Sequence, residues 1–146
     1  MSFYNLPLTV ANGGPSPALN NQTLTFIAGG TIVLGDVVAF DTSLTGADAV
    51  ATVVQAGTTA TVGNARAFGF AAAAAVSGET VPVVVAGYFK SANVDAATVA
   101  GSPLCGPVTA AGRAEICSAA MTAPVFAVAL AADASNVAPV FVFRRI

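Results

Sequence analysis

Two stretches of the chain share one order of apolar and polar positions. In residues 68–87 an apolar segment, Phe-Gly-Phe-Ala, leads to a Ser-Gly-Glu turn and then to a strand that is mostly valine. Residues 126–129 and 138–142 repeat the segment and the strand, at offsets of 58 residues before the turn and 57 after it. Because self-similarity at a nearly constant spacing is typical of a structure built twice, we predict two similar β-hairpins.

The remaining strands are predicted from short runs of β-branched and other apolar residues that glycine-containing turns separate. The alanine run at 71–75 has high helix propensity, but it is too short to nucleate a helix, so we interpret it as strand. The predicted strands outside the two hairpins are 24–28, 31–34, 37–41, 49–55, 58–62, 104–109 and 113–118. Roughly nine to eleven short strands without an amphipathic helix predict an all-β fold, a single-domain β-barrel or β-sandwich.

The valine-rich strand at 81–85 is apolar at every position, so neither of its faces is suited to water. Strands of this kind are covered on both sides, either within a barrel or at an interface. Pro82 and Pro139 lie near the starts of the two equivalent strands. Proline is tolerated there because no ladder donor is needed.

Residues 1–24 differ from the rest of the chain and predict an extended N-terminal arm, with the β-domain spanning 25–146. Glycine and proline at 13–17 punctuate a segment without a steady period. The arm nevertheless carries large apolar residues, which a disordered tail seldom has. These residues are Phe3, Tyr4, Leu6 and Leu8. Two readings stay open: the arm folds back on its own domain, or it lies on a neighbour.

The composition favours a protein that buries surface against partners. Hydrophobic residues make up 55% of the 146 residues and charged residues only 8%, with a net charge of −2. Charged residues make up about 25% of an average protein. The alternative is that small alanines and threonines cover the surface of a monomer.

Charge and hydropathy also argue against two classes of partner. The five basic residues, with Arg144 and Arg145 next to the C-terminus, form no footprint for nucleic acid. Apolar runs such as 67–76 and 123–132 stop short of the roughly 18 residues of a membrane span. The N-terminus lacks the basic and apolar regions of a secretory signal, so we expect the chain to be made in the cytoplasm.

The residue types of catalytic and metal sites are absent or scattered. The chain has no histidine, the commonest general base and a major metal ligand. Its seven acidic residues lack the tight spacing of a calcium site, and Glu79 and Asp133 fall in the two equivalent turns. The glycines fit no phosphate-binding spacing. We therefore expect no enzyme activity, no metal and no cofactor.

Cys105 and Cys117 lie on two strands predicted to form a hairpin. A three-residue loop at 110–112 would place the two cysteines opposite each other, whereas a two-residue loop would place Ser118 opposite Cys105. A cytoplasmic protein normally keeps its thiols reduced, and two cysteines alone make no zinc site. We therefore expect two free, buried thiols.

Several short motifs resemble those of the small capsid decoration (cement) proteins of tailed bacteriophages. Residues 32–38, Ile-Val-Leu-Gly-Asp-Val-Val, look like the apolar, Gly-Asp, apolar opening of that family. The Phe-Gly-Phe-Ala segment, the Ser-Gly-Glu turn and residues 83–87 are similar to its "G-V-A … G-E … V-V-V … G" core. Residues 101–105, 111–113 and 126–130 follow its second progression, "G-D-x-V-Y … x-G-K … I-G-V-A". The resemblance covers roughly residues 30–143, with Gly-Ser-Pro at 101–103 for the Gly-Asp and Ala127 for a glycine.

The resemblance implies a β-tulip-like protein, often a homotrimer, bound to the outside of an icosahedral head at junctions between major capsid subunits. Its partners would be the major capsid protein and further copies of itself, and its location the virion surface. The residues that we expect to contact a partner are Phe3, Tyr4, Leu6, Leu8, Arg144 and Arg145.

Two other classes of function remain. One is another virion component, such as the base of a head fibre or a tail protein. The other is a carbohydrate-binding or cell-surface β-module, which should show exposed aromatic residues. The chain has no tryptophan and only two tyrosines, Tyr4 and Tyr88, which argues against a sugar-binding module.

Overall fold

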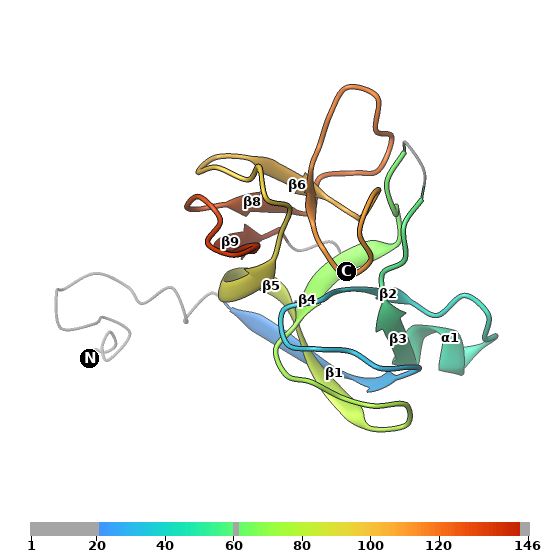
Figure 1. Ribbon diagram of the computed structural model, residues 1–146. Coiled ribbons are helices and arrows are strands. Elements are labelled where there is room, and N and C mark those ends of the chain that lie inside the picture. The colour runs from blue at the N-terminus through green and yellow to red at the C-terminus, as the bar shows by residue number, and fades with distance from the viewer. Residues whose placement is uncertain (1–20, 60–61, 144–146) are drawn as a thin grey trace, which may run out of the picture.

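The computed structural model describes residues 21–59 and 62–143, and in them the predicted all-β fold is confirmed. One sheet connectivity links nine strands in the order β1-β3-β2-β4-β5-β9-β8-β6-β7 (Figure 1). The elements are β1 (Gln22–Ala28), β2 (Val37–Phe40), α1 (Ala47–Ala51), β3 (Thr52–Gln55), β4 (Ala67–Ala71), β5 (Thr80–Asn93), β6 (Pro103–Cys105), β7 (Glu115–Ile116), β8 (Ala127–Ala129) and β9 (Val137–Val142). The first residues of β1 therefore fall within the segment predicted as an arm.

The first five strands close into a barrel, which we call the first unit (residues 22–86). Strand β1 pairs with β3 in parallel and with β5 antiparallel, so the order β1-β3-β2-β4-β5 returns to its start. Three phenylalanines fill its interior: the ring of Phe26 meets those of Phe40 and Phe68 edge-on at 5.9 and 5.5 Å, and the latter two stack at 4.3 Å.

The second unit (residues 87–142) repeats this arrangement with the other half of β5. Strand β5 is 14 residues long, and its C-terminal half pairs with β9 as β1 pairs with its N-terminal half. Thus Asn93 lies opposite Val137 as Ile27 lies opposite Thr80. A parallel bridge between Val94 and Ala114 repeats the β1–β3 contact. In Figure 1 the second unit lies above the first, with β5 running between them.

The repeat predicted from the sequence is confirmed in its strand register. In the first hairpin Phe70 lies opposite Val84, and in the second Val128 lies opposite Phe141. These are the positions that the offsets of 58 and 57 residues place in correspondence. Residues that sequence comparison did not align also correspond: the β2–β3 pairs match the β6–β7 pairs, at an offset of 66 residues in β2 and 61 in β3.

The turns that precede β2 and β6 are built alike. In each a glycine has a positive φ, 89° at Gly35 and 88° at Gly101, a conformation that glycine adopts without strain. The next residue, Asp36 or Ser102, accepts a hydrogen bond from the backbone N–H three residues earlier, at 3.0 and 3.1 Å. The serine that replaces the expected aspartate therefore makes the same contact.

Residues 81–85 of β5 are covered on both faces, as predicted, and the cover comes from the chain itself. Val83 belongs to the core of the first unit, whereas Val84, which points to the other face, belongs to a cluster at the junction of the two units. In that cluster the ring of Phe70 lies 5.3 Å from that of Phe126. The doubly apolar strand is therefore not evidence for a partner.

Four local predictions are wrong. Residues 31–34 form no strand, because only Ile32 makes a bridge, to Ala75, inside a loop. The alanine run leaves the strand after residue 71. The first part of the predicted strand 49–55 is helix α1, a single turn with no buried residue, since Ala and Asp at its start favour a turn over extended backbone. Residues 56–59 are not strand, so no hairpin forms around residues 56–57, and residues 60 and 61 lie outside the described residues.

Candidate functional site

Several features that mark chemical sites were not found within residues 21–59 and 62–143. These residues enclose no detected pocket. They also contain no group of three or more His, Cys, Asp or Glu side chains that could hold a metal ion. No helix among them is long and apolar enough to cross a membrane.

The two buried carboxylates hold loops in place. Asp36 accepts hydrogen bonds from Gln55 Nε2 (2.9 Å) and Asn93 Nδ2 (3.0 Å), so it ties β3 and the end of β5 to the turn before β2. Glu115 accepts hydrogen bonds from the backbone N–H groups of Val108 and Thr109, both at 2.8 Å. Because every one of these partners belongs to the fold, both carboxylates have a structural role.

Gly112 locks the loop of the second unit against the first unit. Its N–H donates to the carbonyl of Ala56 (2.9 Å), and its carbonyl accepts from the N–H of Val37 (2.8 Å). Its φ is +77°, and an added Cβ would lie 2.7 Å from both Asp36 Oδ1 and Gln55 Nε2. Only glycine allows the two units to approach this closely.

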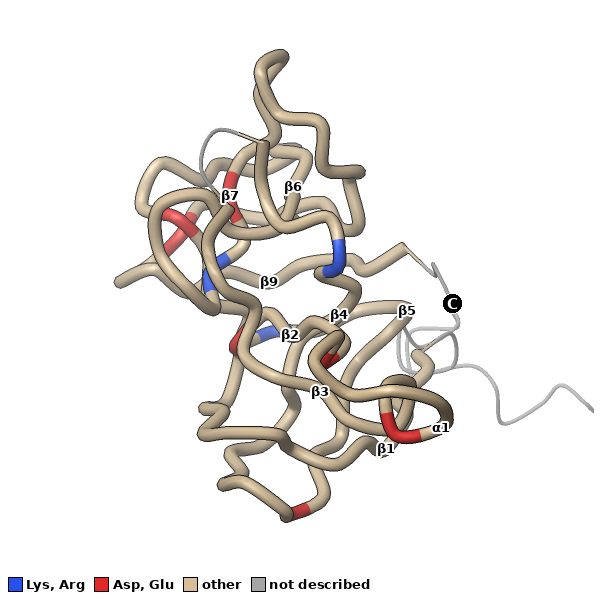
Figure 2. Tube along the Cα trace, turned by 90° about the vertical axis from the view of Figure 1, so that its right-hand side faces the viewer, with Lys and Arg blue, Asp and Glu red and all other residues tan. Residues whose placement is uncertain are grey.

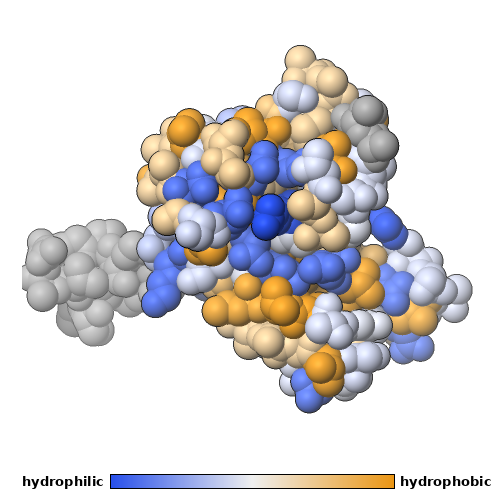
Figure 3. Space-filling model, in the orientation of Figure 1, coloured by the Kyte–Doolittle hydropathy of each residue, from blue (hydrophilic) through white to orange (hydrophobic). Residues whose placement is uncertain are grey.

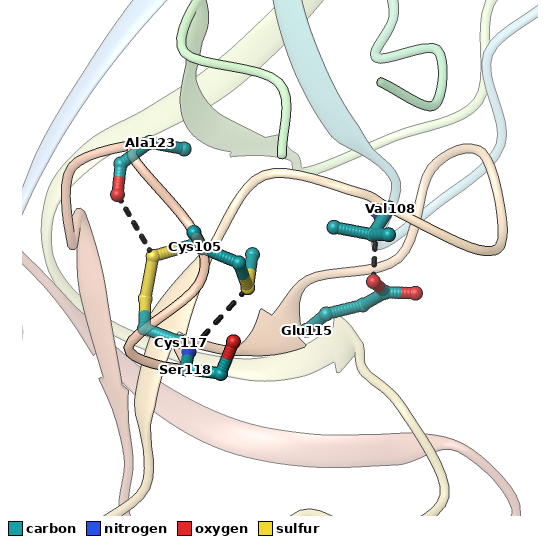
Figure 4. The surroundings of a disulfide bond; sticks show 7 residues. Cys105, Val108, Glu115, Cys117, Ser118 and Ala123 are labelled. Carbon is teal, nitrogen blue, oxygen red and sulfur yellow. Dashed lines mark hydrogen bonds between the residues drawn. A yellow bond between two sulfur atoms is a disulfide. The ribbon is translucent and has the colours of Figure 1, made fainter. Parts of the chain in front are cut away.

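Cys105 and Cys117 form a disulfide, so the expectation of two free thiols is wrong (Figure 4). Their Cα atoms are 5.3 Å apart, within the usual range for a disulfide. Cys105 is fully buried, whereas Cys117 is half-buried. In Figure 4 the bond lies beside the loop that Glu115 holds, close to the backbone of Ala123.

Both hairpin registers considered from the sequence are also wrong. Cys105 lies opposite Glu115, and the N–H of Cys117 donates to the carbonyl of Pro103 (2.9 Å). The cysteines are therefore diagonal neighbours on one face, across a loop of residues 106–114 that is longer than a tight turn. Their counterparts in the first unit are Ala39 and Ala56, so the same geometry exists there without a disulfide.

An exposed apolar row crosses the outside of the second unit. Pro103 on β6 lies opposite Val128 on β8, which lies opposite Phe141 on β9, which lies opposite Tyr88 on β5. Residues directly opposite on antiparallel strands project to the same face. The Phe141 side chain is 38% exposed. Leu130 (46% exposed) and Phe143, whose ring lies 6.1 Å from that of Phe141, flank the row.

We call these six residues the outer face of the second unit. Solvent-facing positions of an antiparallel sheet are usually polar, and none of these six residues is charged. In the first unit the corresponding residues are Val37, Phe70 and Val84, which are buried against the second unit. The fold therefore covers one copy of this face and leaves the other open.

Other exposed apolar residues lie on loops of the first unit. Val33 and Leu34 belong to the segment between β1 and β2, and about half of each side chain is exposed. In Figure 3 apolar residues gather on the lower part of the molecule, below a band of hydrophilic residues that crosses its middle. Charged residues are dispersed as single positions over both units (Figure 2). Among them, hydrogen bonds from the Ser43 hydroxyl and N–H lower the pKa of Asp41 below its ordinary value.

The residues predicted from the sequence to contact a partner all lie outside the described residues. This holds for Phe3, Tyr4, Leu6 and Leu8 of the arm and for Arg144 and Arg145 at the C-terminus. The structure does show where the arm joins the body. The Asn21 side chain accepts a hydrogen bond from the N–H of Tyr88 (2.7 Å) and donates one to its carbonyl (3.0 Å).

Sequence reasoning missed the outer face of the second unit. Its signal was present, because the repeat aligns Phe141 with Val84 and Val128 with Phe70. What the alignment could not show is that one copy is buried and the other exposed.

The fold and the surface thus define a class: a single-domain all-β protein made of two similar units that share one strand. No protein-family model matches the chain, and no curated protein matches it.

Proposed function

We propose that the chain is a structural component of a virion, a decoration (cement) protein. It binds the outside of an icosahedral phage capsid and stabilises contacts between major capsid subunits. The observation that carries the proposal is the uncharged outer face of the second unit, presented on a closely packed β core. Contiguous exposed apolar surface is typical of an interaction site. The proposed role needs such a surface and a stiff body, and it needs no reacting group, metal or cofactor.

The repeated turn supports the resemblance to decoration proteins. The family motif "apolar, Gly-Asp, apolar" is matched at 32–38, and the family's second Gly-Asp corresponds here to Gly101-Ser102. Both sites fold into the same turn, with the same glycine conformation and the same side-chain hydrogen bond. The departure at Ser102 therefore leaves the local structure unchanged.

The proposed mechanism is purely thermodynamic. A protein that binds only the expanded shell stabilises that shell by mass action, by about 2.7 kcal/mol per site at a free concentration 100 times the dissociation constant. Many symmetry-related sites, and association into a homotrimer, add avidity. The chain would be made in the host cytoplasm and would act on the capsid surface.

Two measurements on particles test the proposal. Purified virions are labelled with an antibody to this chain and imaged by negative stain, and we expect label over the heads. Empty expanded shells are mixed with the protein and sedimented, and we expect saturation at a fixed number of copies per shell and greater resistance of the shells to heat. Label confined to tails would indicate another virion component, and no label with no binding would refute a virion role.

Deleting residues 2–17 tests the proposed contribution of the arm to binding. Burying a side chain such as Phe3 or Leu6 on a neighbour contributes roughly 1.5–3 kcal/mol, and ordering the backbone costs about 1–2 kcal/mol per residue. The net effect per copy is therefore small and is amplified by the number of copies. We expect an unchanged circular-dichroism spectrum with lower occupancy on shells. Loss of the fold would show instead that the arm belongs to its own core.

A further inference from the structure

The outer face of the second unit has a counterpart that shows how such a face is used. In the first unit, Val37, Phe70 and Val84 lie at the corresponding positions of the repeat. The chain buries these three side chains completely or nearly so, at the junction with the second unit. No described segment does the same for Val128 and Phe141. The repeat therefore leaves one apolar sheet face without its cover.

Residues 1–20 have the chemistry to provide that cover. This segment contains no Asp, Glu, Lys or Arg, and its apolar residues include Phe3, Tyr4, Leu6 and Leu8. A chain of this length spans at most about 66 Å, whereas four adjacent strands span only about 14 Å. The segment can therefore reach well beyond the body from which it starts.

The point where the segment starts directs it away from the outer face of its own chain. Both backbone polar groups of Tyr88 are bonded to Asn21. The N–H and C=O of one strand residue point to the same side, and those of its neighbours point to the opposite side. Asn21 therefore lies at one edge of β5, whereas β9 pairs along the other edge through Gly87 and Phe89. The row formed by Phe141, Val128 and Pro103 extends from β9 outward, on the far side of β5 from Asn21.

We propose that the outer face of the second unit binds residues 1–20 of a second copy of this chain. The contact joins two different surfaces, and contacts of that kind close into a ring when the rotation between copies allows it. The inference rests on the self-association in the proposed function and adds the receiving surface. It needs no capsid, so its failure in solution is distinguishable from failure to bind shells.

The first experiment measures association of the purified full-length chain by sedimentation equilibrium. The variants are Phe141→Thr on the outer face, the deletion of residues 2–17, and the two combined. Val50→Thr is the matched control, because Val50 is 64% exposed on α1, away from the outer face. We expect Phe141→Thr to raise the dissociation constant about tenfold to hundredfold, as the transfer of a phenylalanine side chain implies. The deletion should abolish association, the combination should add nothing, and the control should behave as the wild type.

The second experiment identifies which chain supplies the segment. A photo-reactive phenylalanine analogue replaces Tyr4 in a mixture of isotopically light and heavy chains, and cross-linked peptides are identified by mass spectrometry. We expect cross-links from position 4 to the peptide spanning 125–143, with light and heavy chains joined. Cross-links only within chains of one label would show that the segment covers its own face. An association that survives both Phe141→Thr and the deletion, or a wild type that stays monomeric, would equally overturn the proposal.

Discussion

Replacing both Cys105 and Cys117 with alanine should lower the stability of the protein by about 3 kcal/mol without changing its fold. The disulfide closes a loop between residues 12 positions apart in the sequence. In the chain-entropy model, a closed loop of about 13 residues removes roughly 10 cal/mol/K from the unfolded state, which is about 3 kcal/mol at 25 °C. For a chain of this size the loss corresponds to roughly 10 °C in Tm.

The first unit supplies the reason to expect an unchanged fold. The corresponding positions there are Ala39 and Ala56, and both are fully buried in the same strand geometry. Alanine is therefore compatible with this place in the repeat. The stabilisation by the disulfide should act on the unfolded chain more than on the folded one.

Denaturant unfolding with and without reductant measures the effect. Reductant should destabilise the wild type by the same amount as the double substitution and should leave the double variant unchanged. Thiol titration of the wild type, unfolded without reductant, should find no reactive thiol. Two reactive thiols per chain, or a double variant as stable as the wild type, would refute this reasoning. A loss well above 5 kcal/mol would show that packing of the buried sulfur, and not loop closure, dominates.

Three further predictions concern single residues. Thr98→Val should stabilise the protein by about 1 kcal/mol in denaturant unfolding, because the buried Thr98 hydroxyl lacks a hydrogen-bond partner; a loss of stability would contradict this. Gly112→Ala should destabilise by about 2 kcal/mol or more, whereas Gly78→Ala, which also has positive φ but open space around it, should cost only about 1–2 kcal/mol, and equal losses would show that the close contact does not matter. Ser43→Ala should raise the pKa of Asp41 toward its ordinary value in an NMR titration, since the serine hydrogen bond favours the ionised carboxylate. The small stabilisation from that bond is present above the unfolded-state pKa of Asp41 and is lost as the pH falls through the lower folded-state value, so an unshifted titration in the variant would refute the assignment.

The sequence determined the β class and the repeat because both depend on local pattern. The valine-rich strand 81–85 and its counterpart near the C-terminus carry a period that a folded structure must bury, and their register follows from that period. Glu79 and Asp133 were correctly placed in equivalent turns, where each accepts a backbone hydrogen bond. Such contacts join residues three apart, so they are visible in the sequence.

The disulfide depended on a loop that has no local signature. Residues 106–114 are held by Glu115 and by the contacts of Gly112 with the first unit, which lies more than 50 residues away in the sequence. These contacts lengthen the hairpin loop and shift its register. Reasoning from turn length alone therefore placed Cys105 opposite the wrong residue.

Only the tertiary structure decided which apolar faces are covered. Phe70 and Val128 occupy the same place in the repeat, and the sequence gives no reason to treat them differently. Burial depends on what packs across the junction, and that follows from the sharing of β5 between the two units. The hydrophobic effect is non-directional, so an apolar pattern shows that a face requires cover without showing what covers it. The fold covers Phe70 from within the chain and leaves Val128 and Phe141 to a partner.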